Sequence, residues 1–225
     1  MTTSTDTSRE HNLMLRTSNA DLAGLLTVPP DACGLVLFAH GSGSSRFSQR
    51  NRSVAEVLQA AQLATLLFDL LTPEEAERDQ LDQALRFDIP LLSQRLVGAI
   101  DWARQRDDLS GLPLGLFGAS TGAAAAIHAA VERPQAVAAM VSRGGRPDLA
   151  MEVLAAVACP TLLIVGGLDF DVLRLNRQAA SRLLARHALL VVPDAGHLFE
   201  EPGTLLHAAD LARDWFVQQL CPART

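Results

Sequence analysis

The sequence predicts a single α/β domain, residues 1–225, built on a mostly parallel sheet flanked by helices. From Gly34 onward, short and nearly continuous apolar runs alternate with stretches of helical periodicity, which is typical of strands covered on both faces. A length of 225 residues is enough for one sizeable core. Apolar residues make up 48% of the chain and charged residues 20%, as in ordinary globular proteins.

Short runs rich in Val, Leu and Ile are the predicted strands of the parallel part. They are Gly34 to Ala39, Leu63 to Asp69, Pro113 to Gly118, Ala136 to Ser142, Pro160 to Gly166 and Ala188 to Val192. Ahead of them, Leu13 to Leu15 and Leu22 to Val28 predict an antiparallel start, which Pro29 and Pro30 end.

Helices are predicted between these runs. Apolar residues follow helical spacing from Val54 to Ala61 and from Leu92 to Ala103, and a last helix is expected to begin near Pro202. Only Arg143 to Ala158 separate two of the predicted strands. We therefore expect no substantial cap domain and an open site.

Charge and hydropathy exclude several classes of protein. The net charge is −6 and the arginines are scattered, so no basic stripe is available for nucleic acid. Residues 1–12 form a polar, flexible leader without the apolar core of a secretion signal, and no apolar run approaches the length of a membrane span. We expect a cytoplasmic protein with no membrane association.

The cysteines give no sign of a metal site or a disulfide framework. Cys33, Cys159 and Cys221 are an odd set without a C-x-x-C pair. They are interpreted as buried or incidental thiols.

The strongest local signal is Gly118-Ala119-Ser120-Thr121-Gly122, which matches G-x-S-x-G between a predicted strand and a predicted helix. This context is typical of a sharp turn that projects a nucleophilic serine above a sheet. A serine hydroxyl is a poor nucleophile at neutral pH, so Ser120 needs a base and a group that orients the base.

Both partners follow later predicted strands, in the chain order that this architecture uses. Asp169 comes after the strand that ends at Gly166, and His197 comes after the strand that ends at Val192. Asp171 is a rival for the orienting role, and a lone loop carboxylate or histidine is more often a helix cap or a surface residue. The ordered trio favours Ser120, Asp169 and His197 as catalytic residues.

Backbone amides are the expected oxyanion donors. One is the amide of Thr121, which follows the nucleophile, and the other is placed at Ser42 in the glycine-rich loop after the first parallel strand. A nucleotide cradle is the weaker interpretation of this loop because it lacks the last glycine of G-x-G-x-x-G and has no Gly-Lys-Ser/Thr. Asp69, Glu74 and Glu75 are expected to cap the next helix.

Four blocks together, LVLFAHGSGSSR, GLFGASTGAAAA, LLIVGGLD and DAGHLFEEPGTL, resemble the dienelactone hydrolase family of the α/β hydrolases over about residues 20–220. The resemblance implies the α/β-hydrolase fold and a hydrolytic triad. Dienelactone hydrolases proper carry cysteine as the nucleophile, whereas this chain carries Ser120, and that difference favours general carboxylester hydrolysis.

The sequence therefore predicts a serine hydrolase that cleaves small carboxylic esters or lactones without a cofactor or metal. Acyl transfer, amide cleavage or perhydrolysis by the same triad are alternatives, as is a non-catalytic ligand-binding protein on the same fold. Arg46 and Arg143 lie near predicted strand ends and are candidates to bind a substrate carboxylate, although structural salt bridges are the commoner role of such residues. Association into homo-oligomers is left open.

Overall fold

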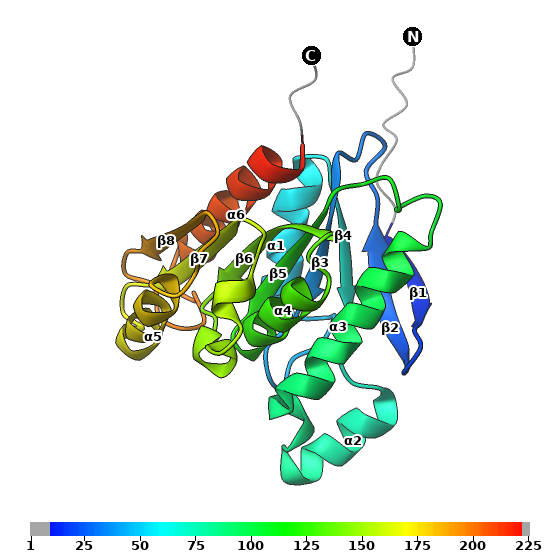
Figure 1. Ribbon diagram of the computed structural model, residues 1–225, viewed down its shortest axis with the longest axis horizontal. Helices are drawn as coiled ribbons and strands as arrows, with labels where there is room; N and C mark the ends of the chain where they lie inside the picture. The colour runs from blue at the N-terminus through cyan, green and yellow to red at the C-terminus, as the bar shows by residue number, and fades with distance from the viewer. Residues whose placement is uncertain (1–9, 222–225) are drawn as a thin grey trace.

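The computed structural model describes residues 10–221 as one eight-stranded sheet with helices on both faces (Figure 1). The order of strands across the sheet is β1-β2-β4-β3-β5-β6-β7-β8. The strands are β1 (Glu10–Arg16), β2 (Asp21–Thr27), β3 (Gly34–Ala39), β4 (Leu63–Phe68), β5 (Leu114–Ala119), β6 (Val137–Arg143), β7 (Thr161–Gly166) and β8 (His187–Val192).

The sheet has an antiparallel start and a parallel body, as the sequence predicts. β1 pairs antiparallel with β2 and β2 with β4, while every pair from β4 to β8 is parallel. The strands β3, β4, β5 and β7 are buried at every position, which explains why they are continuous apolar runs. Parallel strands also bring their carboxyl ends to one edge of the sheet.

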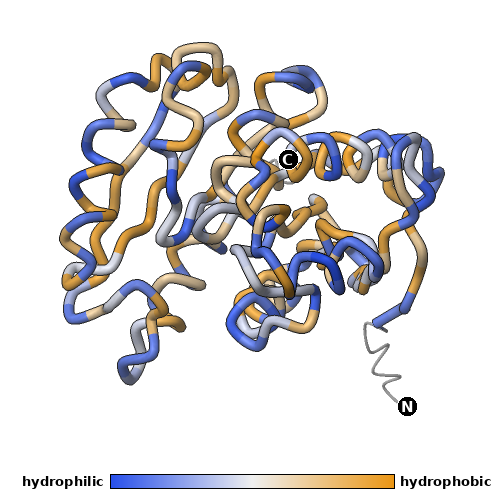
Figure 2. Tube along the Cα trace, turned by 90° about the horizontal axis from the view of Figure 1, so that it is seen from below, coloured by the Kyte–Doolittle hydropathy of each residue, from blue (hydrophilic) through white to orange (hydrophobic). Residues whose placement is uncertain are grey.

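Helices cover both faces of the sheet and divide the core in two. The longer helices are α1 (Gln49–Ala60), α2 (Pro73–Asp82), α3 (Ile89–Arg104), α4 (Thr121–Glu132), α5 (Phe170–Ala180) and α6 (Thr204–Leu220). Figure 1 shows α1 and α6 behind the sheet and α3, α4 and α5 in front of it, and each group packs on its own cluster of buried apolar residues. Along several helices in Figure 2 hydrophobic and hydrophilic residues alternate, as expected for elements with one buried side. Within residues 10–221 no helix combines the length and apolar content needed to cross a bilayer.

Some boundaries differ from those predicted. Residues 1–9 of the expected leader lie outside the described residues, and residues 10–12 belong to β1 rather than to a leader. α6 begins at Thr204, two residues after Pro202. Between β6 and β7 the chain forms only the short 3-10 helices η2 (Pro147–Ala150) and η3 (Leu154–Ala156), so no cap domain is inserted there.

The segment after β4 forms α2 and the 3-10 helix η1 (Leu85–Phe87), and α2 extends beyond the rest of the molecule in Figure 1. The start of α2 is a capping box, because the Thr72 hydroxyl accepts from the Glu75 amide and the Glu75 carboxylate accepts from the Thr72 amide. Pro73 occupies the first turn. The capping role expected for an acidic residue here is confirmed for Glu75, whereas Asp69 pairs with Arg46.

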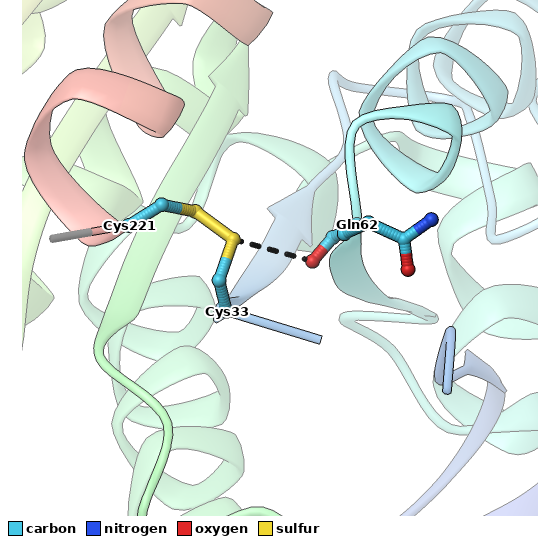
Figure 3. Close-up of a disulfide and its surroundings, with 3 residues drawn as sticks. All are labelled: Cys33, Gln62 and Cys221. Carbon is cyan, nitrogen blue, oxygen red and sulfur yellow. Dashed lines mark hydrogen bonds between the residues drawn. A yellow bond between two sulfur atoms is a disulfide. The ribbon is translucent and has the colours of Figure 1, made fainter. Parts of the chain in front are cut away.

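The interpretation of all three cysteines as incidental thiols is wrong for two of them. Cys33, just before β3, and Cys221, just after α6, form a disulfide with their Cα atoms 5.1 Å apart (Figure 3). The Cys33 sulfur also lies 3.4 Å from the carbonyl oxygen of Gln62. No local sequence pattern predicts this disulfide, because the two cysteines are 188 residues apart. Cys159 is a buried free thiol whose pKa burial raises to about 11.

Candidate active site

Ser120 stands at the turn between β5 and α4 with a backbone conformation that L-residues rarely adopt, φ 51° and ψ −121°. The flanking glycines are required by close packing. A Cβ on Gly122 would lie 2.2 Å from the carbonyl oxygen of Ala39, and one on Gly118 would lie 2.5 Å from the Cα of Ala123. The strand and the helix therefore approach only because both positions lack a side chain.

His197 and Asp169 meet beside this turn. The His197 Nδ1 lies 2.6 Å from the Asp169 Oδ2, and the two residues come from the loops after β8 and β7. When Nδ1–H donates this hydrogen bond to the carboxylate, the imidazole Nε2 is left as the basic nitrogen. Asp171, the alternative candidate for orienting His197, does not contact the histidine. Its side chain is 93% exposed and lies 3.8 Å from the guanidinium of Arg174.

Ser120 and His197 line one cavity of about 230 Å³ at the carboxyl edge of the parallel strands. Its wall also includes Ser42, Gly144 and two arginines, Arg143 and Arg50, of which Arg50 lies 3.5 Å from the Glu200 carboxylate. A Cβ on Gly144 would lie 3.7 Å from the imidazole Cε1 of His197, an ordinary van der Waals distance, so this glycine lies directly beside the ring.

The loop after β3 passes close to the nucleophile. A Cβ on Gly41 would lie 3.1 Å from the Cβ of Ser120. The amide of Ser42, one of the two expected oxyanion donors, donates a hydrogen bond of 2.9 Å to the Thr121 hydroxyl. The amide of Thr121, the other expected donor, is the first of α4 and has no carbonyl partner within the helix. Both residues are thus where the sequence predicts them, but the Ser42 amide is already occupied.

His40 holds this loop, a role that the sequence analysis did not assign. Its Nδ1 lies 2.9 Å from the Gly41 carbonyl oxygen, and its Nε2 lies 3.1 Å from the Leu70 amide nitrogen, from which it accepts a hydrogen bond. The neutral tautomer with the proton on Nδ1 satisfies both contacts. Burial lowers the pKa of His40, which keeps the ring neutral.

Arg143 is a buried cation without a carboxylate partner among residues 10–221. The residue is 7% exposed, its Nη2 lies 3.3 Å from the Asn51 Oδ1, and its Nη1 makes no hydrogen bond. Phe117 and Phe199 lie with their ring centroids 5.8 Å from the guanidinium carbon. Burial, with a smaller effect of nearby Arg50, lowers the pKa of Arg143 to about 10. Arg143 is therefore charged at neutral pH and faces the cavity of Ser120.

Arg46, the other candidate to bind a substrate carboxylate, is engaged by protein groups. Its guanidinium forms an ion pair with Asp69, and its backbone amide donates to the same carboxylate at 2.7 Å. It lines a separate, larger cavity of about 420 Å³ under α2, which shares Gly41, Ser42 and Ser44 with the smaller one but does not include Ser120. Arg46 has the structural role that is common for such arginines.

Several residues in or next to this cavity have no signal in the sequence. Arg50 and Asn51 reach the cavity from α1, an element with no recognisable motif, and His40 is marked only by its place before the glycine-rich loop. Within residues 10–221 no group of three or more His, Cys, Asp or Glu side chains is placed to hold a metal ion.

Comparison with known proteins gives a consistent result for the fold. No family model matches the sequence. The crystal structure of a dienelactone hydrolase from Anabaena variabilis is 54% identical, with a TM-score of 0.93, over 95% of this chain and 99% of that chain. Est1E from Butyrivibrio proteoclasticus is 14% identical with a TM-score of 0.78, over 92% of this chain and 98% of that one. At that identity the likeness shows the fold alone.

Two curated proteins from strains of Mycobacterium tuberculosis, provisionally named phosphoribosyl transferase, are 54% identical over 213 residues. The match covers 95% of this chain but 47% of theirs, so this chain spans about half the length of the curated relatives. Their name describes the longer proteins.

Proposed function

Because this chain belongs to the dienelactone hydrolase family of α/β hydrolases, we propose that it cleaves small carboxylic esters or lactones through a covalent intermediate on Ser120. The observation that carries the proposal is the 2.6 Å contact between His197 and Asp169, with His197 and Ser120 lining one cavity. A strained serine turn, a histidine and a partly buried carboxylate have no shared structural purpose that explains their meeting there.

In this mechanism His197 Nε2 takes the proton of Ser120 Oγ as the oxygen attacks the ester carbonyl, and Asp169 stabilises the imidazolium that forms. The imidazolium then gives its proton to the leaving alcohol, and an acyl ester remains on Ser120. A water molecule, deprotonated by the same imidazole, attacks this ester, and the imidazolium returns the proton to Ser120 Oγ as the acid leaves. The cycle restores Ser120 and needs no cofactor.

The charge in the cavity suggests which esters fit. Within residues 10–221 Arg143 has no carboxylate counter-ion, so a carboxylate on the substrate would gain a charge-assisted contact there. Arg50 also lines the cavity, but its guanidinium already lies 3.5 Å from the Glu200 carboxylate. We therefore propose Arg143 as the substrate-binding arginine and do not extend that role to Arg46, which Asp69 neutralises. The wild-type protein should have a lower KM for a monoester of a dicarboxylic acid than for its neutral diester, and Arg143→Gln should abolish the difference. If the wild-type protein has equal KM values for the monoester and the diester, Arg143 does not bind a substrate carboxylate.

A fluorophosphonate probe tests the central proposal without knowledge of the natural substrate. It labels an activated serine, so the protein should be labelled and the adduct should map to Ser120. Ser120→Ala should lose both labelling and ester turnover while retaining its thermal unfolding temperature. Turnover at the wild-type rate by Ser120→Ala, or labelling at another residue, would exclude the mechanism.

The same acyl intermediate would also permit acyl transfer. Product analysis in the presence of competing alcohols and amines separates hydrolysis from acyl transfer. In hydrolysis the acyl group appears only as the free acid, whereas in transfer it appears as a new ester or amide. Predominant transfer would change the acceptor in the proposal but not the role of Ser120.

A further inference from the structure

The hydrogen bond between Ser42 and Thr121 changes how the oxyanion site works. The Ser42 amide points at the Thr121 hydroxyl, 2.9 Å away, instead of standing free. The hydroxyl accepts that bond and has no other partner within residues 10–221. Because a threonine hydroxyl is also a donor, its own hydrogen remains available. Thr121 is 3% exposed, so bulk water does not compete strongly for that hydrogen.

We propose that the Thr121 hydroxyl is itself an oxyanion donor, so that one residue supplies two hydrogen bonds to the tetrahedral intermediate. The inference rests on the proposed function, since it concerns the oxyanion formed on Ser120. The first donor is the Thr121 amide at the start of α4, which directly follows the nucleophile. The second is the Thr121 O–H, and the Ser42 amide acts on the substrate through it.

The physical reason is a chain of two hydrogen bonds, of which the structure contains the first, from the Ser42 amide to the Thr121 hydroxyl. A hydroxyl that accepts an N–H bond becomes a better donor, because hydrogen bonds in series polarise one another. An O–H donor to an oxyanion also forms a short, charge-assisted bond. The hydroxyl therefore stabilises the negative oxygen of the transition state more than it stabilises the neutral carbonyl of the bound ester. This difference in stabilisation accelerates the reaction.

The test compares wild type, Thr121→Val and Thr121→Ser in ester hydrolysis. Valine has nearly the same shape and keeps the backbone amide, so it removes only the hydroxyl. We expect Thr121→Val to lower kcat by about 10²- to 10³-fold with little change in KM, the usual effect of losing one oxyanion donor. Thr121→Ser restores the hydroxyl and should recover most of the lost kcat.

A thionoester substrate separates donation from a merely structural role. Sulfur is a weak hydrogen-bond acceptor, so loss of a donor should slow the oxygen ester much more than its thionoester. A displaced loop or nucleophile would slow both substrates equally. Thr161→Val is the matched control, because the Thr161 hydroxyl is also buried and donates to the Cys159 carbonyl at the amino end of β7. It should leave kcat unchanged.

Each outcome decides the inference. If Thr121→Val hydrolyses the ester as fast as or faster than wild type, the hydroxyl blocks the Ser42 amide or is inert, and the inference fails. Equal loss for the ester and the thionoester also refutes it. If the wild type neither hydrolyses esters nor reacts with a fluorophosphonate at Ser120, the proposed function has failed instead.

Discussion

Removal of the disulfide should lower stability without changing the active site. The bond joins Cys33 and Cys221 across 188 residues, nearly the whole described chain. In the chain-entropy model a loop of that length restricts the unfolded state by about 5 kcal/mol at 25 °C. Measured losses for native disulfides are about 2–5 kcal/mol, so a loss of that size is expected for the double variant Cys33→Ala/Cys221→Ala.

The folded state should change little in that variant. Leu220, next to Cys221, is fully buried, and a Cβ on Gly34 would lie 2.8 Å from the Leu220 Cβ, so α6 is docked on β3 without help from the sulfurs. The disulfide lies at the amino end of β3, whereas Ser42 follows its carboxyl end. Turnover at 25 °C should therefore stay within a factor of about 2 of wild type, because no catalytic contact is altered.

Urea denaturation with and without reductant provides the measurement. With an m-value of about 2–3 kcal/mol/M, the midpoint of the double variant should fall by roughly 1–2 M urea. Reductant should lower the wild-type midpoint in the same way and leave the double variant unchanged. A double variant with the wild-type midpoint would refute the reasoning, as would a wild type whose sulfurs are shown by mass to be reduced without any loss of stability.

Three other perturbations follow from the site. Asp169→Asn should reduce kcat by about 10⁴-fold, because His197 loses the partner that fixes its tautomer, while Asp171→Asn should have almost no effect on kcat. If Asp171→Asn has the larger effect, Asp171 is the residue that orients His197. Burial lowers the pKa of His40 in the folded state, so the unfolded chain binds the proton more tightly and the unfolding free energy should decrease as pH falls below about 6.5. In urea titrations at several pH values, His40→Gln should reduce this dependence of the unfolding free energy on pH. The same dependence in His40→Gln and wild type would contradict the prediction. Gly122→Ala should destabilise the protein by more than about 3 kcal/mol, because the added Cβ meets backbone, whereas Gly111→Ala, with nothing within 4 Å, should be neutral in thermal unfolding.

The central sheet was predictable because its strands carry a local signal. A strand buried on both faces must be apolar at each position, and β3 begins and ends at the predicted residues. The edge strand β8 is exposed at several positions, yet it differs from the prediction by only one residue, His187. The helix starts were less accurate, since caps depend on side-chain contacts such as the one between Thr72 and Glu75.

The places of Ser120, Asp169 and His197, the proposed catalytic trio, were predictable for a different reason, which is that each residue follows a strand that could itself be recognised. The residues around it were not. Asn51 and Arg50 enter the cavity from α1, which packs against β4 and α6, and only the three-dimensional fold brings them to Arg143 at the end of β6. The disulfide is the extreme case, because residues that are 188 positions apart have no periodicity or motif in common. Sequence patterns report on neighbours along the chain, whereas these contacts depend on the fold.

The disulfide also bears on where the protein works. Structural disulfides are rare in a reducing cytosol, so the cytoplasmic location expected from the sequence and the oxidised Cys33–Cys221 pair favour different compartments. In the reduced protein, the Cys33 thiol would be placed to donate to the Gln62 carbonyl oxygen, 3.4 Å away. The reduced form therefore retains a local partner, and the fold does not depend on oxidation for that contact.

The two ends of the sheet have opposite roles in stability. At the carboxyl end, Ser120 has a strained backbone and Arg143 is buried without a carboxylate partner among the described residues 10–221, and both features cost folding free energy. Neither can be relaxed without loss of the proposed chemistry, since the strain exposes the nucleophile and the unpaired charge attracts the substrate. At the amino end, the Cys33–Cys221 bond acts mainly on the unfolded chain, so it offsets that cost without touching the cavity. A stabilising link placed at the carboxyl end would instead have to share space with the loops that hold Ser42 and His197.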